Sequence, residues 1–144
     1  MLKVKFYDNV ADDLLKFAVI ISKTDNKLIF CKHKERDTYE IPGGHREPGE
    51  SILETAKREL QEETGASDFK IEQICVYSVQ EKTKENDNNA DETFGMLFIA
   101  DVFSFGELHY EIEKILISDK LVENWTYPLI QPLLIEEAKN RGFI

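Results

Sequence analysis

Residues 43–65 read GGHREPGESILETAKRELQEETG, and this stretch determines most of what the sequence predicts. Ser51 followed by Glu54 is a capping box, the reciprocal hydrogen-bonding pattern that often starts a helix. Gly65 stands where a helix commonly ends in the left-handed conformation. The sequence therefore predicts a helix over residues 51–63.

This predicted helix has an apolar stripe and an acidic stripe side by side. With side chains about 100° apart around the axis, the residues that face the core are Ile52, Leu53, Ala56 and Leu60. The far side is expected to be solvated and holds Glu54, Lys57 and Gln61. The carboxylates of Glu59, Glu62 and Glu63 are spaced i, i+3, i+4, so they are neighbours on the surface next to the apolar stripe.

Three carboxylates in this position repel one another, and they lie in the last turn, where the helix dipole is already negative. Arg58 can pair with Glu62 one turn on, but one guanidinium does not neutralise three carboxylates. A solvated acidic face is the alternative, and the position of Glu59 and Glu63 beside the core argues against it. A divalent cation removes the repulsion, and all-oxygen ligation suits Mg²⁺ or Mn²⁺.

The rest of the chain alternates between predicted strands and a second helix. Apolar runs rich in β-branched and aromatic residues predict strands at 17–21, 27–31, 69–79, 93–103 and 112–117. Turn residues at 24–26 join the first two strands into a hairpin, and the polar stretch 81–92 predicts a mobile loop. A second helix is expected over 129–140, with Gly142 as its stop. Trp125 and Tyr127 are expected to pack that helix onto the sheet, and stacking on a base is the alternative.

The composition fits one acidic domain, which we place at residues 1–144. The chain carries 18 Lys and Arg against 28 Asp and Glu, a formal charge of −10. Duplex nucleic acid and anionic membranes call for a basic footprint, so neither is expected as the main partner. No apolar run reaches the roughly 18–20 residues of a membrane span, and the first residues lack a secretory signal, which favours a cytoplasmic location. The two cysteines, Cys31 and Cys75, are too few for a disulfide framework and are expected in the core.

The spacing of the Gly, Glu, Arg and Leu residues in the stretch 43–65 resembles the Nudix hydrolase box. Gly44 is followed after five residues by Glu50 and, after seven more, by Arg58-Glu59-Leu60, one residue, Glu62-Glu63, one residue and Gly65. Eight fixed positions over 22 residues match, and Ala66 departs from the larger aliphatic residue usual at the next position. The resemblance implies an α/β fold, the Nudix-type α/β/α sandwich with a mixed β-sheet.

The resemblance also implies a role for each residue of the box. The family cleaves a phosphoanhydride of a nucleoside diphosphate derivative with water and a divalent metal, here expected to be Mg²⁺ or Mn²⁺. By similarity, the metal ligands are Glu62, Glu63 and the Gly44 carbonyl, with Glu59 either a third ligand or the group that orients the attacking water. Glu50 is expected nearby, directly or through water. Arg58 matches the arginine that holds the box glutamates in place.

Two sites outside the box complete the expected machinery. The segment 110–115 is similar to the one that supplies a general base in some members, and Glu111 fits best, although a solvated strand end explains it equally well. A basic stretch with Lys32, Lys34 and Arg36 leads toward the box and is expected, with Glu40, on the substrate side. Solvation at a strand end also accounts for this basic stretch.

The class of substrate can be inferred only by excluding classes whose sequence features this chain lacks. The chain has no proline between Pro48 and Pro128, whereas ADP-ribose hydrolases of the family tend to carry one shortly after the box. What remains is a small member that acts on a nucleoside or deoxynucleoside triphosphate and releases the monophosphate and pyrophosphate. Alternatives are a nucleotide-sugar or dinucleoside polyphosphate hydrolase, or a catalytically silent nucleotide-binding sensor. An isoprenoid diphosphate isomerase of related fold should need extra Cys and His ligands, and we expect no such cluster. A homodimer is compatible with the sequence.

Overall fold

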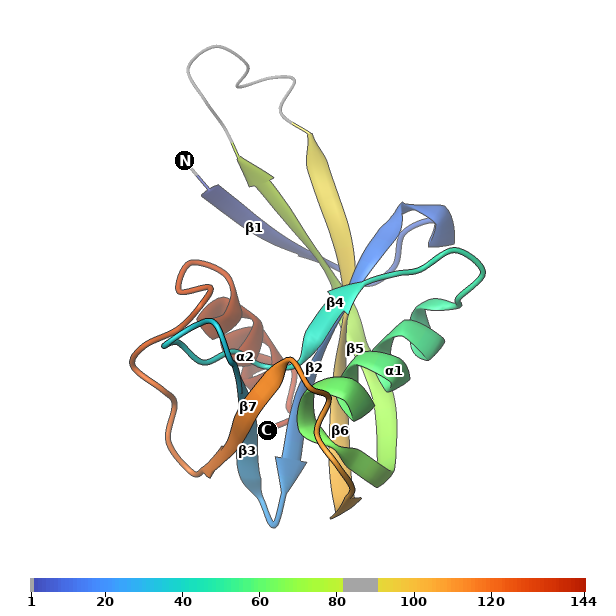
Figure 1. Cartoon of the computed structure of the whole chain (residues 1–144). Helices are drawn as coiled ribbons and strands as arrows, with labels where there is room; N and C mark the ends of the chain where they lie inside the picture. Colours follow the sequence, from blue (N-terminus) through green and yellow to red (C-terminus); the bar gives the residue numbers. More distant parts are fainter. Residues whose placement is uncertain (1, 82–90) are drawn as a thin grey trace.

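A mixed sheet forms the centre of the computed structural model, which describes residues 2–81 and 91–144 (Figure 1). Its seven strands are β1 (Leu2–Tyr7), β2 (Leu15–Thr24), β3 (Lys27–His33), β4 (Gly43–His45), β5 (Ala66–Glu81), β6 (Glu92–Phe105) and β7 (Ile112–Ser118). The strand order is β1-β5-β6-β2-β3-β7, with β4 also paired to β2. Only the β2–β6 pair among these described strands is parallel, so the predicted mixed sheet is confirmed.

Two helices cover opposite faces of this sheet, as Figure 1 shows for α1 (Ile52–Thr64) and α2 (Gln131–Asn140). Side chains alternate across β2, so Ala18 and Ile20 pack in the core on the α1 side, and Val19 and Ile21 pack on the α2 side. The expected α/β/α sandwich is therefore confirmed. Neither α1 nor α2, nor the short 3₁₀ helix Asp12–Leu14, is long and apolar enough to cross a membrane.

The capping box at the start of α1 is present as predicted. The Ser51 hydroxyl accepts the Glu54 N–H at 3.1 Å, and the Glu54 carboxylate accepts the Ser51 N–H at 2.9 Å. Gly65 ends the helix with φ 77° and donates its N–H to the Gln61 carbonyl. Ile52, Ala56 and Leu60 are buried. Leu53, however, is 37% exposed, because it lies at the edge of the apolar stripe rather than at its centre.

Most boundaries differ from the prediction by a few residues, and two strands were missed. Asp25 and Asn26 adopt positive φ in the predicted turn, and β5 starts at Ala66, directly after the α1 cap. Helix α2 begins at Gln131 rather than at 129, with a proline in its first turn, where the missing N–H costs no hydrogen bond. The strands β1 and β4 were not predicted, and β4 exists only through its pairing with β2.

The predicted mobile loop falls mainly at residues 82–90, outside the described residues. Its two expected end residues belong to strands instead, because Glu81 ends β5 and Glu92 begins β6.

Candidate active site

The residues of the box meet where α1 packs against β4. A Cβ built on Gly44 would lie 2.5 Å from Cδ of Glu59, so the Glu59 carboxyl group lies directly against the Gly44 backbone. Any side chain at position 44 would displace this carboxyl group. The structure therefore brings together the two box residues that the sequence placed fifteen positions apart.

Arg58 joins the helix to the loop that precedes it. Its Nε lies 2.7 Å from Glu50 Oε2, and its Nη1 lies 2.7 Å from Glu59 Oε1. The predicted pairing with Glu62 is present but longer, at 3.5 Å. Nη2 also donates to the His45 carbonyl at 3.0 Å. Arg58 thus holds the box carboxylates in place, as the sequence predicted, and Glu50 and Glu59 are its closest partners.

Glu50 is held in its ionised form by these contacts. Besides Arg58, the Thr55 hydroxyl and the Glu47 N–H each donate to Glu50 Oε1 at 2.9 Å. The hydrogen bond from Arg58 is the main reason that the pKa of Glu50 is lowered to about 2. Glu50 therefore serves first as the anchor of Arg58.

Glu59 has the opposite environment. Burial, reinforced by the nearby negative charge of Glu63, raises the pKa of Glu59 to about 7 despite its hydrogen bond from Arg58. A carboxylate in this position gains stability from any added positive charge, whether a proton or a cation.

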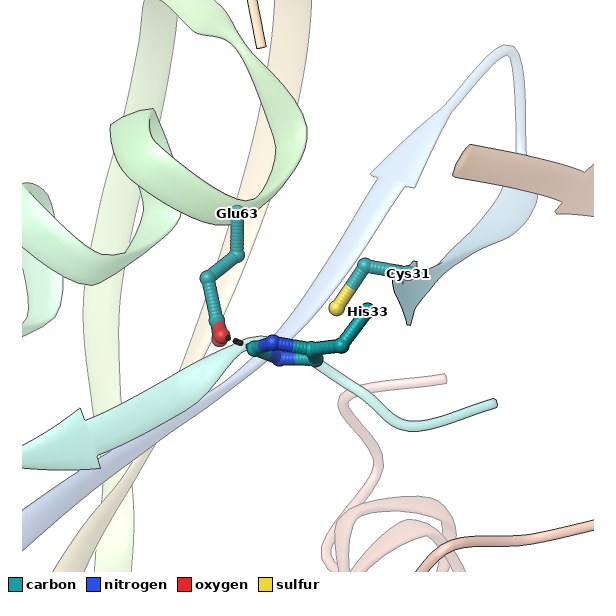
Figure 2. A group of neighbouring side chains, drawn as sticks. All are labelled: Cys31, His33 and Glu63. Carbon is teal, nitrogen blue, oxygen red and sulfur yellow. Dashed lines mark ion pairs between the residues drawn. The ribbon is translucent and has the colours of Figure 1, made fainter. Parts of the chain in front are cut away.

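Glu63 is buried, and both of its oxygens have partners. Oε1 accepts the Gly43 N–H at 2.7 Å, and Oε2 lies 2.9 Å from Nε2 of His33 on β3 (Figure 2). The hydrogen bond to Glu63 raises the pKa of His33. His33 belongs to the basic stretch 32–36 that leads toward the box, and its contact with Glu63 was not predicted. It follows Cys31 by two residues on β3, on the α1-facing side that also carries Ile29.

A second buried carboxylate, Glu40, lies beside this pair. Its Oε1 is 3.6 Å from His33 Nε2 and accepts a hydrogen bond from Arg36 Nη1 at 2.8 Å. Burial raises the pKa of Glu40. Glu40, expected on the substrate side, also lines a cavity on the other face of β4.

A group of side chains that could bind a metal ion includes Glu63 together with two residues that were not predicted as ligands. Among the described residues, one set of three Cys, His, Asp or Glu side chains has all donor atoms within 4.8 Å of one another, and it is Cys31, His33 and Glu63. Arg58 occupies the space between Glu59 and Glu62 instead. The fold thus adds Glu63 to one Cys and one His of β3, a grouping that spacing along the sequence did not reveal.

The remaining predicted residues lie around a hollow of about 380 Å³ next to the His33 end of β3. It is lined by His33, Lys34, Glu35, Arg36, Tyr110 and Glu111. The Glu111 side chain is 58% exposed, with its Oε2 4.0 Å from Nδ1 of His109. Lys32 turns to β7 instead, where its Nζ lies 3.1 Å from Glu113 Oε2. The roles of these residues in binding phosphate or moving a proton stay predictions.

A cavity of about 330 Å³ opens between the box glycines and α2. Its lining includes Gly43 and Gly44 at one end and the aromatic rings of Phe17, Tyr77 and Tyr127. Trp125 does not take part, since it packs edge-on against Phe30 with ring centroids 5.6 Å apart. The expected packing role is therefore confirmed for Trp125, whereas Tyr127 faces the cavity.

The model of the NUDIX domain family matches residues 14–140. The chain belongs to the Nudix family. It is 35% identical over 82 residues to YtkD of Bacillus subtilis (strain 168), whose name assigns it provisionally to the 8-oxo-dGTP diphosphatases. That match covers 57% of this chain and 51% of YtkD, so it spans about half of the relative's length.

Solved structures show the same Nudix fold. A mutant of the Bacillus subtilis pyrophosphohydrolase BsRppH superposes with a TM-score of 0.77 and 23% identity, over 99% of this chain and 92% of that one. A Nudix hydrolase from Nitrosomonas europaea gives a TM-score of 0.67 and 24% identity, over 88% and 89% of the two chains. At these identities the likeness concerns the fold.

Proposed function

We propose that this Nudix chain is a metal-dependent hydrolase of nucleoside triphosphates that releases the monophosphate and pyrophosphate. The observation that carries the proposal is the position of the 330 Å³ cavity, which ends at Gly43 and Gly44. Its volume lies in the range of about 300–1,000 Å³ that small-molecule sites occupy. A base held between Tyr127 and Phe17 would place its phosphates at the box, next to the glutamates.

The donor set of the box fits a hard divalent cation. Glu59, Glu62, Glu63 and the Gly44 carbonyl offer only oxygen, which Mg²⁺ and Mn²⁺ prefer. The half-buried position of Glu59 and its raised pKa support the need for a positive charge there. When bound, such a cation supplies charge neutralisation for the phosphate oxygens and activation of water.

The protein residues supply the positioning. Arg58 fixes the direction of the Glu59 carboxylate, and Glu50 fixes Arg58. Glu59 then orients the attacking water by accepting a hydrogen bond from it, without taking its proton. Glu63, through its hydrogen bond to the Gly43 N–H, keeps β4 and the helix at a fixed separation. We assign the general base to Glu111, which requires the segment before β7 to bring its exposed carboxylate toward the substrate.

The likeness to YtkD suggests a modified purine nucleotide, 8-oxo-dGTP, among the substrates. Aromatic and aliphatic side chains line the cavity, as stacking on a purine requires. The polar groups available to read the base edge include Glu40 and the Thr93 hydroxyl. The amide of Gln131 is less available, because its oxygen already accepts the Ile41 N–H at 2.9 Å.

A substrate panel tests the proposal. Purified protein with Mg²⁺ is offered dGTP, 8-oxo-dGTP, ADP-ribose, a nucleotide sugar and a dinucleoside polyphosphate, and the products are separated by chromatography. We expect the fastest turnover with a triphosphate, with pyrophosphate as a product. Preferred cleavage of ADP-ribose or of a nucleotide sugar would contradict the substrate class, and no metal-stimulated cleavage of any compound would indicate a silent sensor.

A further inference from the structure

We propose that Cys31, His33 and Glu63 bind a thiophilic divalent cation such as Zn²⁺, at a site that shares one residue with the all-oxygen site of the box. Cys31 and His33 lie two residues apart on β3, so their side chains leave the same face of the strand. Glu63 reaches them from the last turn of α1 (Figure 2). The three donor atoms lie within 4.8 Å of one another.

The spacing of the donors is close to what such an ion needs. With Zn–S bonds of about 2.3 Å and Zn–N or Zn–O bonds of about 2.0–2.2 Å, the ligand atoms of a tetrahedral site are roughly 3–4 Å apart. His33 Nε2 is 2.9 Å from Glu63 Oε2, slightly closer than that. An ion between them therefore requires these two side chains to move slightly apart.

The backbone around the cluster is fixed by hydrogen bonds, which is typical of a built site. Cys31 and Glu40 exchange two backbone hydrogen bonds, with the Cys31 N–H donating at 2.8 Å and the Glu40 N–H at 3.0 Å. Glu63 is fixed from the other side by the Gly43 N–H. All three donors therefore stand on regular elements, and the site requires no rearrangement of a loop.

A fourth ligand is available next to these three. The Glu40 side chain is buried, and its Oε1 is 3.6 Å from His33 Nε2. The His33 imidazole and the Arg36 guanidinium both contact Glu40, and His33 also contacts Glu63. A divalent ion would take over the neutralisation of both buried carboxylates.

The donor chemistry separates this site from the one assigned to Mg²⁺. Thiolate and imidazole ligands favour Zn²⁺ and Co²⁺, whereas Mg²⁺ takes oxygen ligands. Both sites use Glu63, so occupation of the thiol site removes a ligand from the box. This consequence rests on the proposed function, and it predicts that Zn²⁺ inhibits the Mg²⁺-dependent hydrolysis by competition. The binding of Zn²⁺ itself does not depend on any catalytic activity.

The test uses Co²⁺ as a spectroscopic probe, because a thiolate bound to Co²⁺ gives a charge-transfer absorption in the near ultraviolet. The full chain is titrated with Co²⁺ without nucleotide, and Zn²⁺ is then added. We expect the absorption to appear at one equivalent and to disappear as Zn²⁺ displaces Co²⁺. The variant Cys31→Ser should lose this absorption and bind Co²⁺ at least about tenfold more weakly.

The chain supplies a matched control. Cys75, the other cysteine, is buried in the core on the α2 side of the sheet. Cys75→Ser should keep the absorption of the unchanged protein. A second variant, His33→Asn, should weaken Co²⁺ binding at least about tenfold while leaving both cysteines in place, which covers the case in which Cys31→Ser does not fold.

Three results would overturn the proposal: no thiolate absorption in the unchanged protein, absorption that survives in Cys31→Ser, or equal loss in Cys75→Ser. The readout needs no substrate, so failure of the thiol site is distinguishable from failure of the proposed function. If the absorption appears and no nucleotide is hydrolysed, the site stands and the hydrolase proposal falls.

Discussion

The Glu59 carboxyl group lies against the Gly44 backbone so closely that a Cβ on Gly44 would be 2.5 Å from Cδ of Glu59. This contact limits how far apart β4 and the Glu59 face of α1 lie. Gly44 does not have a positive φ, so its backbone conformation does not require glycine. The contact with Glu59 does, because it leaves no room for a side chain.

Gly44→Ala should push the Glu59 carboxylate out of its place. We expect the metal-dependent turnover to fall by about 10- to 100-fold, since displacing an orienting group by a fraction of an ångström has effects of that size. Gly106→Ala is the control, because a Cβ there meets only the Gly65 carbonyl at 3.7 Å, an ordinary contact. Steady-state kinetics at saturating Mg²⁺ check the pair, and equal activities in both variants would contradict the role of this contact.

Arg58→Lys tests whether the guanidinium geometry matters or only its charge. Arg58 bonds to Glu50, Glu59 and the His45 carbonyl at once, and a single ammonium cannot reach all three in the same geometry. We expect kcat to fall by about tenfold or more. Arg141→Lys changes an arginine that pairs with Glu137 at 2.8 Å, far along the sequence at the end of α2, and should leave kcat unchanged. If Arg58→Lys retained full activity, Arg58 would act only as a charge.

The ion pair of Glu50 with Arg58 predicts a pH dependence of stability. The folded pKa of Glu50 is lowered to about 2, whereas an unfolded glutamate titrates near 4.3. A lowered pKa stabilises the fold above the unfolded pKa, and this stabilisation is lost as the pH falls from about 4.3 toward 2. The difference in unfolding free energy between the unchanged protein and Glu50→Gln should therefore be largest at neutral pH and shrink with acid. Urea titrations in a chelator from pH 7 to pH 3 measure it, and a constant difference would contradict the assignment.

Glu111→Gln tests the predicted general base. We expect kcat to fall by about 10²–10⁴-fold if this carboxylate takes the proton, with little change in Mg²⁺ affinity. Glu113→Gln is the matched control, because Glu113 lies in the same segment and pairs with Lys32 instead. Activity of Glu111→Gln within a few-fold of the control would assign the proton transfer to another group.

The local pattern of the box predicted more of the structure than any other part of the chain. The capping box, the Gly65 cap and the contact of Arg58 with Glu62 all depend on residues within one or two turns of each other, so spacing alone reveals them. The predicted burial of Leu53 was wrong, because the exposure of a residue at the edge of an apolar stripe depends on its neighbours in space.

Contacts between distant segments could not be read from spacing. His33 meets Glu63 only because α1 packs on the face of the sheet toward which the His33 side chain points. The pairing of β4 with β2 likewise places the Gly43 N–H where it donates to Glu63. The strand β1 could have been predicted from the sequence. Leu2, Val4 and Phe6 alternate with lysines, which is the alternation typical of a strand. The cavity at α2 is lined by residues from five helices and strands, from the segment before β4 and from the turn before α2, so it becomes visible only in the fold.

Metal-dependent hydrolysis by the box glutamates is tested most directly by pyrophosphate release from 8-oxo-dGTP. The unchanged protein is compared with Glu62→Gln, with and without Mg²⁺. Glu54→Gln, on the solvated side of the same helix, is the control. We predict Mg²⁺-dependent release that falls by about 10²–10⁴-fold in Glu62→Gln and remains in Glu54→Gln. Release by Glu62→Gln within a few-fold of the unchanged protein, or release that does not depend on Mg²⁺, would contradict it.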